Sequence, residues 1–176
     1  MRFSKVSLNL FLITSLAFLY PVNSIAAPSP SPTKAAPKMI TSPKGSTPPN
    51  YEISFNKNGK TSIDIWEDFQ CANCAKFHTT NGDFISKVIS DGKIKINFHI
   101  LSFLGADSVM LANAAACAAD EGKFLPAHAQ LFKLQSENKN SGIWTNEFLQ
   151  TKMAEVGIGS TKYNKCIENK KYLKWV

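Results

Sequence analysis

Two cysteines separated by two residues, Cys71 and Cys74, stand at the junction between an extended segment and a helical one. Ahead of them, residues 61–66 alternate between polar and apolar side chains, with Ile63 and Ile65 on one face, which is the pattern of a short strand. The run after Cys74 favours a helix. A strand that leads directly into a helix predicts an α/β domain with the cysteine pair at the helix N-terminus.

Hydrophobic spacing predicts further elements on either side of this unit. Residues 51–55 alternate and precede an Asn-Gly turn, which indicates a first strand. Helical spacing after the cysteines continues to Asp91, and Gly92 ends it. Residues 94–100 alternate over their whole length and form the clearest strand in the chain.

The character of the chain changes after this strand, because alternation gives way to helical spacing from about residue 106 to residue 170. Alanines dominate the first helix of this block, which is predicted over residues 108–121. Four helices are expected, beginning at Asp107 as a cap, at Pro126 in a first turn, at Thr145 or Asn146, and at Ser160 as a cap.

Residues 1–26 have the pattern of a secretory signal peptide. Arg2 and Lys5 give a positively charged start, an apolar run follows, and Ser24 and Ala26 supply the small residues of a cleavage site. An uncleaved membrane anchor is the alternative, although the run is short and interrupted for a span of roughly 20 residues. In either case the rest of the chain is expected to be extracytoplasmic.

Residues 27–50 are rich in proline, serine and lysine and carry little apolar surface. This composition predicts a disordered tether, so the folded domain is expected over residues 51–176. The net charge is +7 at pH 7, with the lysines scattered except near the C-terminus. Nucleic-acid binding needs a basic face interleaved with aromatic side chains, and export argues against it, so no nucleic-acid partner is expected.

A Cys-x-x-Cys pair at a helix N-terminus suits thiol–disulfide exchange, which needs one thiolate that attacks and a second thiol that resolves the mixed disulfide. The unpaired N–H groups and the positive dipole end of the helix lower the pKa of Cys71, which is therefore the predicted nucleophile. Cys74 lies one turn further along and is the predicted resolving thiol.

Two other interpretations of the pair remain open at this point. Cys71 and Cys74 could close a purely structural disulfide, but so tight a loop adds little stability. With His78 they supply three metal ligands, yet a structural zinc site needs four and no fourth is evident, so no metal is expected. His78 is predicted to be an exposed helix residue, and His99 and His128 to lie on polar faces.

Cys117 and Cys166 form a different kind of pair, because each lies within a predicted helix far from the other in the sequence. In an exported chain two such cysteines are expected to form a structural disulfide, with two buried free thiols as the alternative. Closing a loop of about fifty residues would stabilise the fold by about 4 kcal/mol.

The chain resembles the DsbA-like branch of the thioredoxin superfamily over residues 51–176. The resemblance rests on Trp66–His78 around the cysteine pair and continues in Asn113–Ala119 and Phe124–Phe132. It implies an α/β, thioredoxin-like fold with a helical insertion at about residues 106–170.

The resemblance also implies roles for the cysteines. Such proteins use a redox-active pair, here Cys71 as nucleophile and Cys74 as resolver, and some exported members carry a second disulfide between helices, which fits Cys117 and Cys166. Two sulfur atoms carry the redox equivalents, so no cofactor is expected. The implied partners are cysteine-containing exported proteins and a membrane redox partner that recycles the pair. Membrane contact is expected only if the N-terminal segment stays uncleaved.

We therefore expect an extracytoplasmic enzyme that oxidises cysteine pairs of secreted proteins. A disulfide reductase or isomerase is the alternative within the same class, because the direction of electron flow depends on potential and partners. A non-catalytic binding module, tethered to the cell envelope through residues 27–50, is the alternative from another class.

Two features depart from the family pattern. Ala72-Asn73 replaces the Pro-His or Pro-Tyr common between the cysteines, and without a histidine at Asn73 the site is expected to be less oxidising than the strongest oxidases. The family's Gly-x-x-Gly-Thr-Pro loop, whose cis-proline faces the cysteine pair, is not found before Val176, and Pro126 begins a helix instead. The family's C-terminal strands and helix are therefore expected to be missing.

Overall fold

The computed structural model describes residues 52–56 and 58–176. The expected signal peptide at residues 1–26 and the tether at residues 27–50 lie outside the described residues, and so does Tyr51 at the start of the expected domain.

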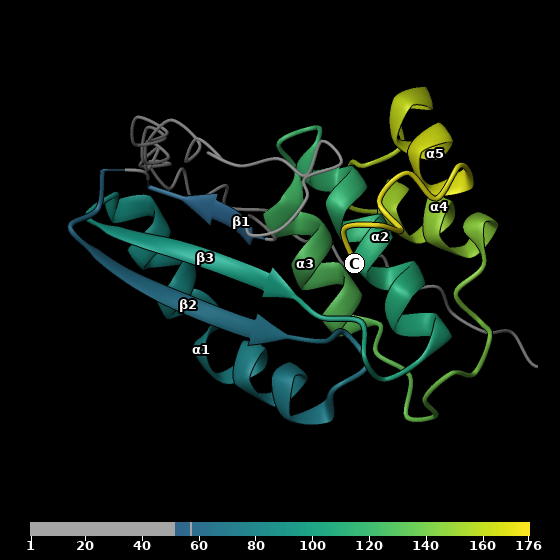
Figure 1. The fold of residues 1–176 in the computed structure, drawn as a ribbon, viewed down its shortest axis with the longest axis horizontal. Coiled ribbons are helices and arrows are strands. Elements are labelled where there is room, and N and C mark those ends of the chain that lie inside the picture. Colours follow the sequence, from purple (N-terminus) through teal and green to yellow (C-terminus); the bar gives the residue numbers. More distant parts are fainter. Residues whose placement is uncertain (1–51, 57) are drawn as a thin grey trace, which may run out of the picture. The chain divides into compact units, whose positions relative to one another are not determined.

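The described strands form one three-stranded sheet in the order β1-β3-β2. β1 (Glu52–Phe55) pairs antiparallel with β3 (Ile94–Ile100), and β2 (Thr61–Glu67) pairs parallel with β3 (Figure 1). The strands expected from alternation are confirmed, with β2 one residue longer than predicted. Parallel strands need a crossover connection, which the helix between β2 and β3 supplies.

The register places the isoleucine and phenylalanine side chains of all three strands on one face of the sheet. Ile53 and Ile65 both lie opposite Phe98, and all three are buried. The other face is polar apart from Trp66, and there Ser54 Oγ donates to Asn97 Oδ1 at 2.7 Å. Because alternate residues face opposite sides, a shift of one residue would exchange the two faces, so the apolar residues fix the register.

The helix α1 (Ala72–Asp91) spans the whole predicted helical segment after the cysteines. Its C-cap Gly92 has a φ of 73°, the left-handed conformation in which glycine ends a helix at little cost. The helix packs against β3, and its partly buried Ile85 and Val88 add to the core. α1 therefore carries Cys74 on a helix that is fixed to the sheet.

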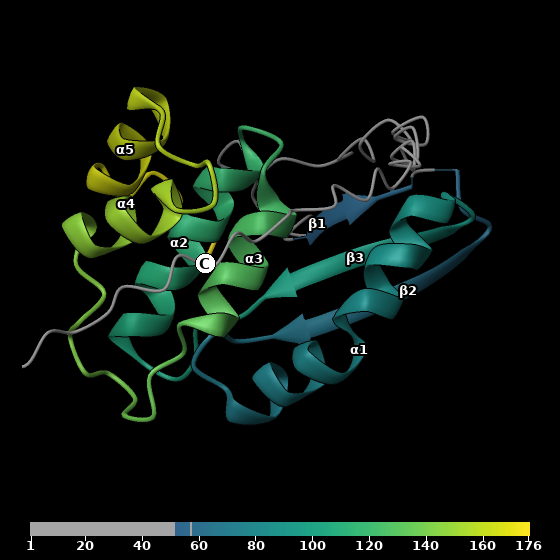
Figure 2. The ribbon, with the colours of Figure 1, turned by 180° about the vertical axis from the view of Figure 1, so that it is seen from behind.

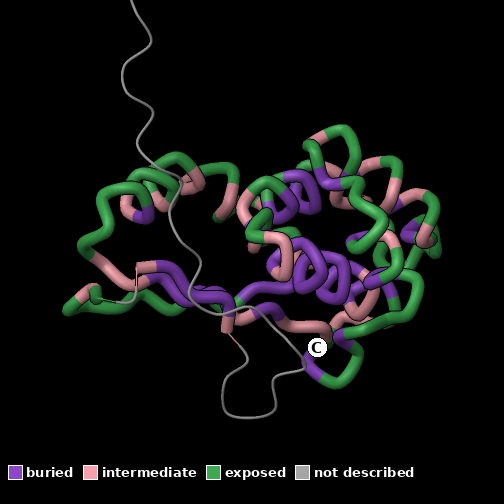
Figure 3. The backbone as a smooth tube through the Cα atoms, turned by 90° about the horizontal axis from the view of Figure 1, so that it is seen from above, coloured by how far each residue is buried: buried purple, intermediate pink, exposed green. Residues whose placement is uncertain are grey.

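The remaining helices form the helical block expected after β3 (Figure 2). They are α2 (Ala106–Ala119), α3 (Phe124–Lys133), α4 (Asn146–Ala154) and α5 (Thr161–Glu168). Every residue of α2 from Leu111 to Ala119 is buried, and Figure 3 shows long buried stretches in the helices as well as in the sheet. Because alanine side chains are small, α3 and α5 can both pack closely on α2.

Two predicted helix starts are confirmed by their caps. Thr145 accepts the N–H of Phe148 with its hydroxyl and caps α4. Ser160 does the same for the N–H of Tyr163 and caps α5. In both cases the acceptor and the donor are three residues apart, so the local sequence was sufficient to place the cap.

The predicted cap of α2 is wrong. Asp107 lies inside the first turn, and Gly105 occupies the cap position without a side-chain hydrogen bond. The N–H of Asp107 is accepted by Asn140 Oδ1 at 3.2 Å, while the Asp107 carboxylate accepts the N–H of Gly142 at 3.1 Å. An amide 33 positions away therefore satisfies the helix N-terminus, which no local pattern indicates.

Aromatic side chains of α3 join the helical block to the sheet. The ring centroid of Phe124 lies 5.1 Å from that of Phe98 and 6.3 Å from that of Phe55, and all three rings are buried. α3 therefore packs on the apolar face of the sheet, where its first turn contacts β1 and β3. Pro126 lies within this first turn, as predicted.

β2 is one of the two edge strands of the described sheet, and β1 is the other. Trp66 of β2 is 62% exposed and stacks on His99 with the ring centroids 3.9 Å apart. His99 Nε2 lies 2.9 Å from Asp64 Oδ1, so His99 belongs to the polar face of the sheet, as predicted. Among the helices of the described residues, none is both long enough and apolar enough to cross a bilayer.

Candidate active site

The loop Asp68–Gln70 connects β2 to α1 and places the two cysteines at the helix N-terminus. Cys71 is the N-cap of α1, with backbone angles of φ −82° and ψ 114°. Its sulfur accepts the N–H of Cys74 at 3.4 Å. Both cysteines are free and partly exposed, so the pair is in its dithiol form.

The two thiols have opposite pKa shifts. Partial burial raises the pKa of Cys71, but hydrogen bonds from Cys74 and from the backbone N–H of Asn73 outweigh burial and bring the pKa below its usual value. Burial raises the pKa of Cys74 to about 11, and its hydrogen bond to the Cys71 sulfur adds to the rise. Ala72 and Asn73 are exposed, so the site opens to solvent on this side. The arrangement therefore places a thiol that ionises readily, Cys71, beside a thiol that stays protonated near neutral pH, Cys74.

Iodoacetamide at neutral pH is expected to alkylate Cys71 well before Cys74 in the reduced protein. The thiolate is the reactive form, and the pKa of Cys71 is lowered while that of Cys74 is raised to about 11. Peptide mass spectrometry over a pH series measures both midpoints, with a free cysteine derivative as the rate standard. Equal labelling of the two residues at every pH would contradict this ionisation order.

A buried acid–histidine pair lies next to the cysteines. Glu67, the last residue of β2, is buried and hydrogen-bonded through Oε1 to Nε2 of His128 on α3. The prediction that His128 lies on a polar face is wrong, because the residue is 5% exposed and its ring is 5.7 Å from that of Phe69. Burial of Cys74 and its hydrogen bond to Cys71 are the larger causes of the raised pKa of Cys74, and the charge of Glu67 adds a smaller rise.

His78 is partly buried, so the prediction of an exposed residue is wrong as well. Its ring lies 4.9 Å from that of His128 and stacks on Phe132 of α3 at 5.3 Å. Burial lowers the pKa of His78, and the charge of His128 lowers it further. Within residues 52–56 and 58–176, no group of three or more His, Cys, Asp or Glu side chains is placed to hold a metal ion.

Two concavities meet at Glu67. A cleft of about 330 Å³ between the edge of β2 and α1 is lined by Cys74, Trp66 and Phe77, among others. A second cavity of about 380 Å³ between α1 and α3 is lined by Glu67, His78 and other residues. Glu67 contributes to the walls of both. The lining of the cleft at Cys74 is largely apolar.

The loop before Cys71 contains a second buried carboxylate, that of Asp68. Asp68 accepts the N–H of Gln70 at 2.8 Å, the Ser108 hydroxyl at 2.7 Å and the N–H of Leu104 at 3.2 Å. Sequence reasoning missed the roles of both acids. The signal was the adjacent pair Glu67-Asp68 at a strand end, because two buried acids require partners elsewhere in the fold.

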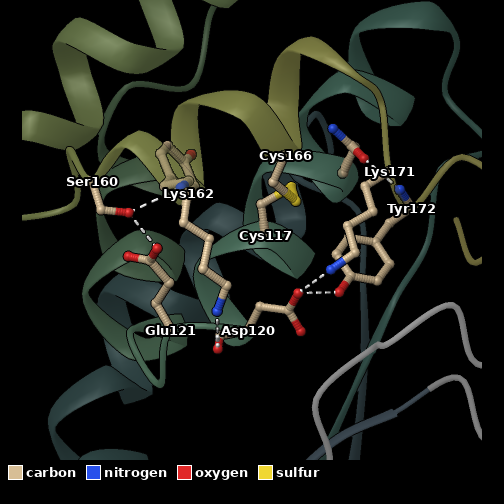
Figure 4. The surroundings of a disulfide bond; sticks show 10 residues. Cys117, Asp120, Glu121, Ser160, Lys162, Cys166, Lys171 and Tyr172 are labelled. Atoms are coloured by element: carbon tan, nitrogen blue, oxygen red, sulfur yellow. Dashed lines mark hydrogen bonds and ion pairs between the residues drawn. A yellow bond between two sulfur atoms is a disulfide. The ribbon is translucent and has the colours of Figure 1, made fainter.

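Cys117 of α2 and Cys166 of α5 form a disulfide with a Cα–Cα distance of 5.8 Å. Figure 4 shows it between the two helices, with Asp120 nearby. Asp120 accepts hydrogen bonds from Lys171, at 2.5 Å, and from the Tyr172 hydroxyl. This cross-link lies within the helical block, and the free cysteine pair belongs to the β2–α1 junction.

Comparison with known proteins decides the family. A family model described as Thioredoxin matches residues 56–176. The chain belongs to the thioredoxin family. Its sheet, active-site helix and helical block give the DsbA-like version of the thioredoxin fold expected from the sequence.

Several solved thioredoxin-family structures resemble it. Reduced DsbA from Mycobacterium tuberculosis has a TM-score of 0.62 and 28% identity, over 77% of this chain and 71% of that chain. MdbA, a thiol-disulfide oxidoreductase from Actinomyces oris, has a TM-score of 0.61 and 25% identity, over 72% and 68%. The reduced disulfide bond oxidoreductase DsbG from M. tuberculosis has a TM-score of 0.60 and 28% identity, over 77% and 67%. A search of curated proteins gave no significant match.

These likenesses and the free thiol pair make this thioredoxin-family protein a thiol–disulfide oxidoreductase.

Proposed function

We propose that this thioredoxin-family protein works outside the cytoplasm and oxidises cysteine pairs of exported proteins through Cys71 and Cys74. The ionisation order at the N-terminus of α1 carries the proposal: the pKa of Cys71 is lowered and that of Cys74 is raised. A stabilised Cys71 thiolate favours the reduced state and is a good leaving group, which makes the disulfide form an oxidant. The signal-like residues 1–26 support the location.

The reaction begins with a disulfide between Cys71 and Cys74. A substrate thiolate attacks Cys71 Sγ, the bond between the two cysteines breaks, and Cys74 leaves as a thiolate that takes up a proton. The second substrate thiolate then attacks the substrate sulfur that is bonded to Cys71, the substrate disulfide forms, and Cys71 leaves as a thiolate. The substrate loses two electrons and gains a disulfide, and the enzyme gains two electrons and returns to the dithiol form.

The surroundings of the pair favour an extended protein segment as the substrate. Trp66 and Phe77 are 62% and 45% exposed on either side of the cleft that contains Cys74. Apolar side chains of a partly unfolded chain can pack on these exposed rings, since exposed apolar surface of this kind marks protein interaction sites. The proposed substrates are therefore secreted proteins that still have reduced cysteines.

Each turnover leaves the enzyme with two thiols, so an oxidant must restore the disulfide. We propose a membrane redox partner that withdraws two electrons from Cys71 and Cys74. The Cys71 thiolate attacks a disulfide of the partner, and Cys74 then resolves the mixed disulfide, so that the partner leaves with two thiols and the enzyme regains its disulfide. Both cysteines are partly exposed, which allows the partner to reach them.

A redox titration of the pair in glutathione buffers is expected to give a reversible two-electron transition between about −120 and −200 mV. The lowered pKa of Cys71 favours this range, and Ala72-Asn73 between the cysteines is expected to place the value away from its oxidising end. Alkylation followed by mass spectrometry measures the fraction of reduced pair at each buffer ratio. A potential near or below about −270 mV would indicate a reductase and contradict the proposed direction.

A further inference from the structure

The loop before Cys71 is held from outside by an amide of the helical block. Gln135 Nε2 donates to the carbonyl oxygen of Phe69 at 2.6 Å and to that of Cys71 at 3.1 Å. The Gln135 amide nitrogen thus donates both of its hydrogens, one to the carbonyl of Phe69 in the loop and one to the carbonyl of Cys71, the N-cap of α1. These contacts span 66 and 64 positions of sequence, so they are purely tertiary.

The position of Gln135 is itself fixed by the end of α3. The residue follows the helix by two positions, and its backbone N–H donates to the carbonyl of Phe132 at 3.2 Å. The ring of Phe132 also packs against the ring of Phe69, the residue whose carbonyl Gln135 contacts, and the two ring centroids are 4.9 Å apart. The buried contact between Phe69 and Phe132 therefore holds the end of α3 at the distance from which the Gln135 amide reaches the loop before Cys71.

The Cys71 carbonyl links this amide to the sulfur. The same oxygen accepts the N–H of Ala75 at 3.0 Å, the first backbone hydrogen bond of α1. Fixing this carbonyl restrains the peptide unit between Cys71 and Ala72, and with it the first turn of α1, whose Asn73 and Cys74 N–H groups donate to Cys71 Sγ. If the N-terminus of α1 frayed, these N–H groups would no longer point at Cys71 Sγ, because the first turn of a helix has few backbone hydrogen bonds of its own to hold it.

We propose that Gln135 is a positioning residue for the nucleophile: its amide clamps the carbonyls of Phe69 and Cys71 and holds the first turn of α1 in the orientation that stabilises the Cys71 thiolate. The helical block thereby takes part in setting the reactivity of a cysteine that it does not carry. The inference rests on the proposed role of Cys71 as nucleophile.

Substitution of Gln135 by methionine tests the clamp. Gln135→Met keeps the length and most of the volume of the side chain but removes both N–H donors. Gln150→Met is the matched control, because the Gln150 amide donates to Glu168 at 2.8 Å, between α4 and α5. Gln135→Asn is the second variant, since its amide is one methylene too short to reach both carbonyls.

The readout is the pH midpoint of the Cys71 thiolate in the reduced protein, followed by ultraviolet absorbance and by alkylation rate. Both Gln135 variants are expected to raise this midpoint by about one pH unit, equivalent to a tenfold smaller thiolate fraction below the midpoint. The control is expected to leave it unchanged. A thermal melt of each variant verifies that the measurement reports a folded protein.

A merely structural role for Gln135 predicts a different result. The melting temperature would fall while the Cys71 midpoint of the folded variants stays at the wild-type value, and that result would overturn the clamp. Failure of the proposed function is recognised separately, in the wild type: a midpoint equal to that of a free thiol would mean that Cys71 is not an activated nucleophile, and would overturn both inferences together.

Discussion

Substitution of Cys71 by serine is expected to reduce the rate of disulfide transfer to a dithiol peptide by roughly three orders of magnitude or more. A serine hydroxyl neither forms a mixed disulfide nor ionises near neutral pH, so both steps of the exchange are lost. Peptide oxidation monitored by mass spectrometry measures the rate. A residual activity within tenfold of the wild type would rule out Cys71 as the attacked sulfur.

Cys74→Ser is the matched control for this experiment, because it removes one sulfur and keeps the other. The variant cannot form the internal disulfide, so it also loses oxidase turnover. Its Cys71 thiolate still attacks a disulfide such as oxidised glutathione, and without a resolving thiol the mixed disulfide is expected to accumulate. Accumulation on Cys71→Ser instead would reverse the assigned roles of the two cysteines.

Removal of the Cys117–Cys166 disulfide by alanine substitution of both residues is expected to lower the free energy of unfolding by about 4 kcal/mol. The disulfide closes a loop of 49 positions and ties α2 to α5. In the chain-entropy model, its loss frees the unfolded chain more than the folded one. Urea unfolding followed by circular dichroism measures the difference between wild type and variant under oxidising conditions.

The control is a Cys71→Ala/Cys74→Ala double variant, which removes the redox-active pair and leaves the helix cross-link intact. It is expected to unfold close to the wild type, because the loop between Cys71 and Cys74 is too short to restrict the unfolded chain strongly. Labelling of Cys117 in denatured protein that has never been reduced would show that the helix disulfide does not form.

The histidines illustrate how far sequence reasoning reaches. His99 alternates with Phe98 along β3, and the strand period correctly assigns it to the polar face. His128 looks similar in the sequence, yet it is buried and pairs with Glu67, which is 61 positions away. A single polar residue on a helix has no period of its own, so its burial depends on which element packs there.

The amides follow the same rule. Asn140 accepts the N–H of Asp107 in the first turn of α2, 33 positions away in the sequence. Gln135 donates to the carbonyls of Phe69 and Cys71, which are 66 and 64 positions away. Neither residue lies in a regular helix or strand. Loop amides have no sequence signature for a distant partner, because any buried carbonyl or N–H group can provide one.

The sequence alone determined the strands and the four later helices, together with the Cys-x-x-Cys pair at the N-terminus of α1. Each of these depends on neighbours within a few residues: alternation, helical spacing, caps such as Thr145 and Ser160, and the dipole of the helix. Only the tertiary structure decided which groups surround the cysteines. His128 of α3 pairs with Glu67, and Gln135 just after α3 donates to the carbonyls of Phe69 and Cys71. These contacts depend on how α3 packs against the β2–α1 junction, which arises from the shape of the whole core.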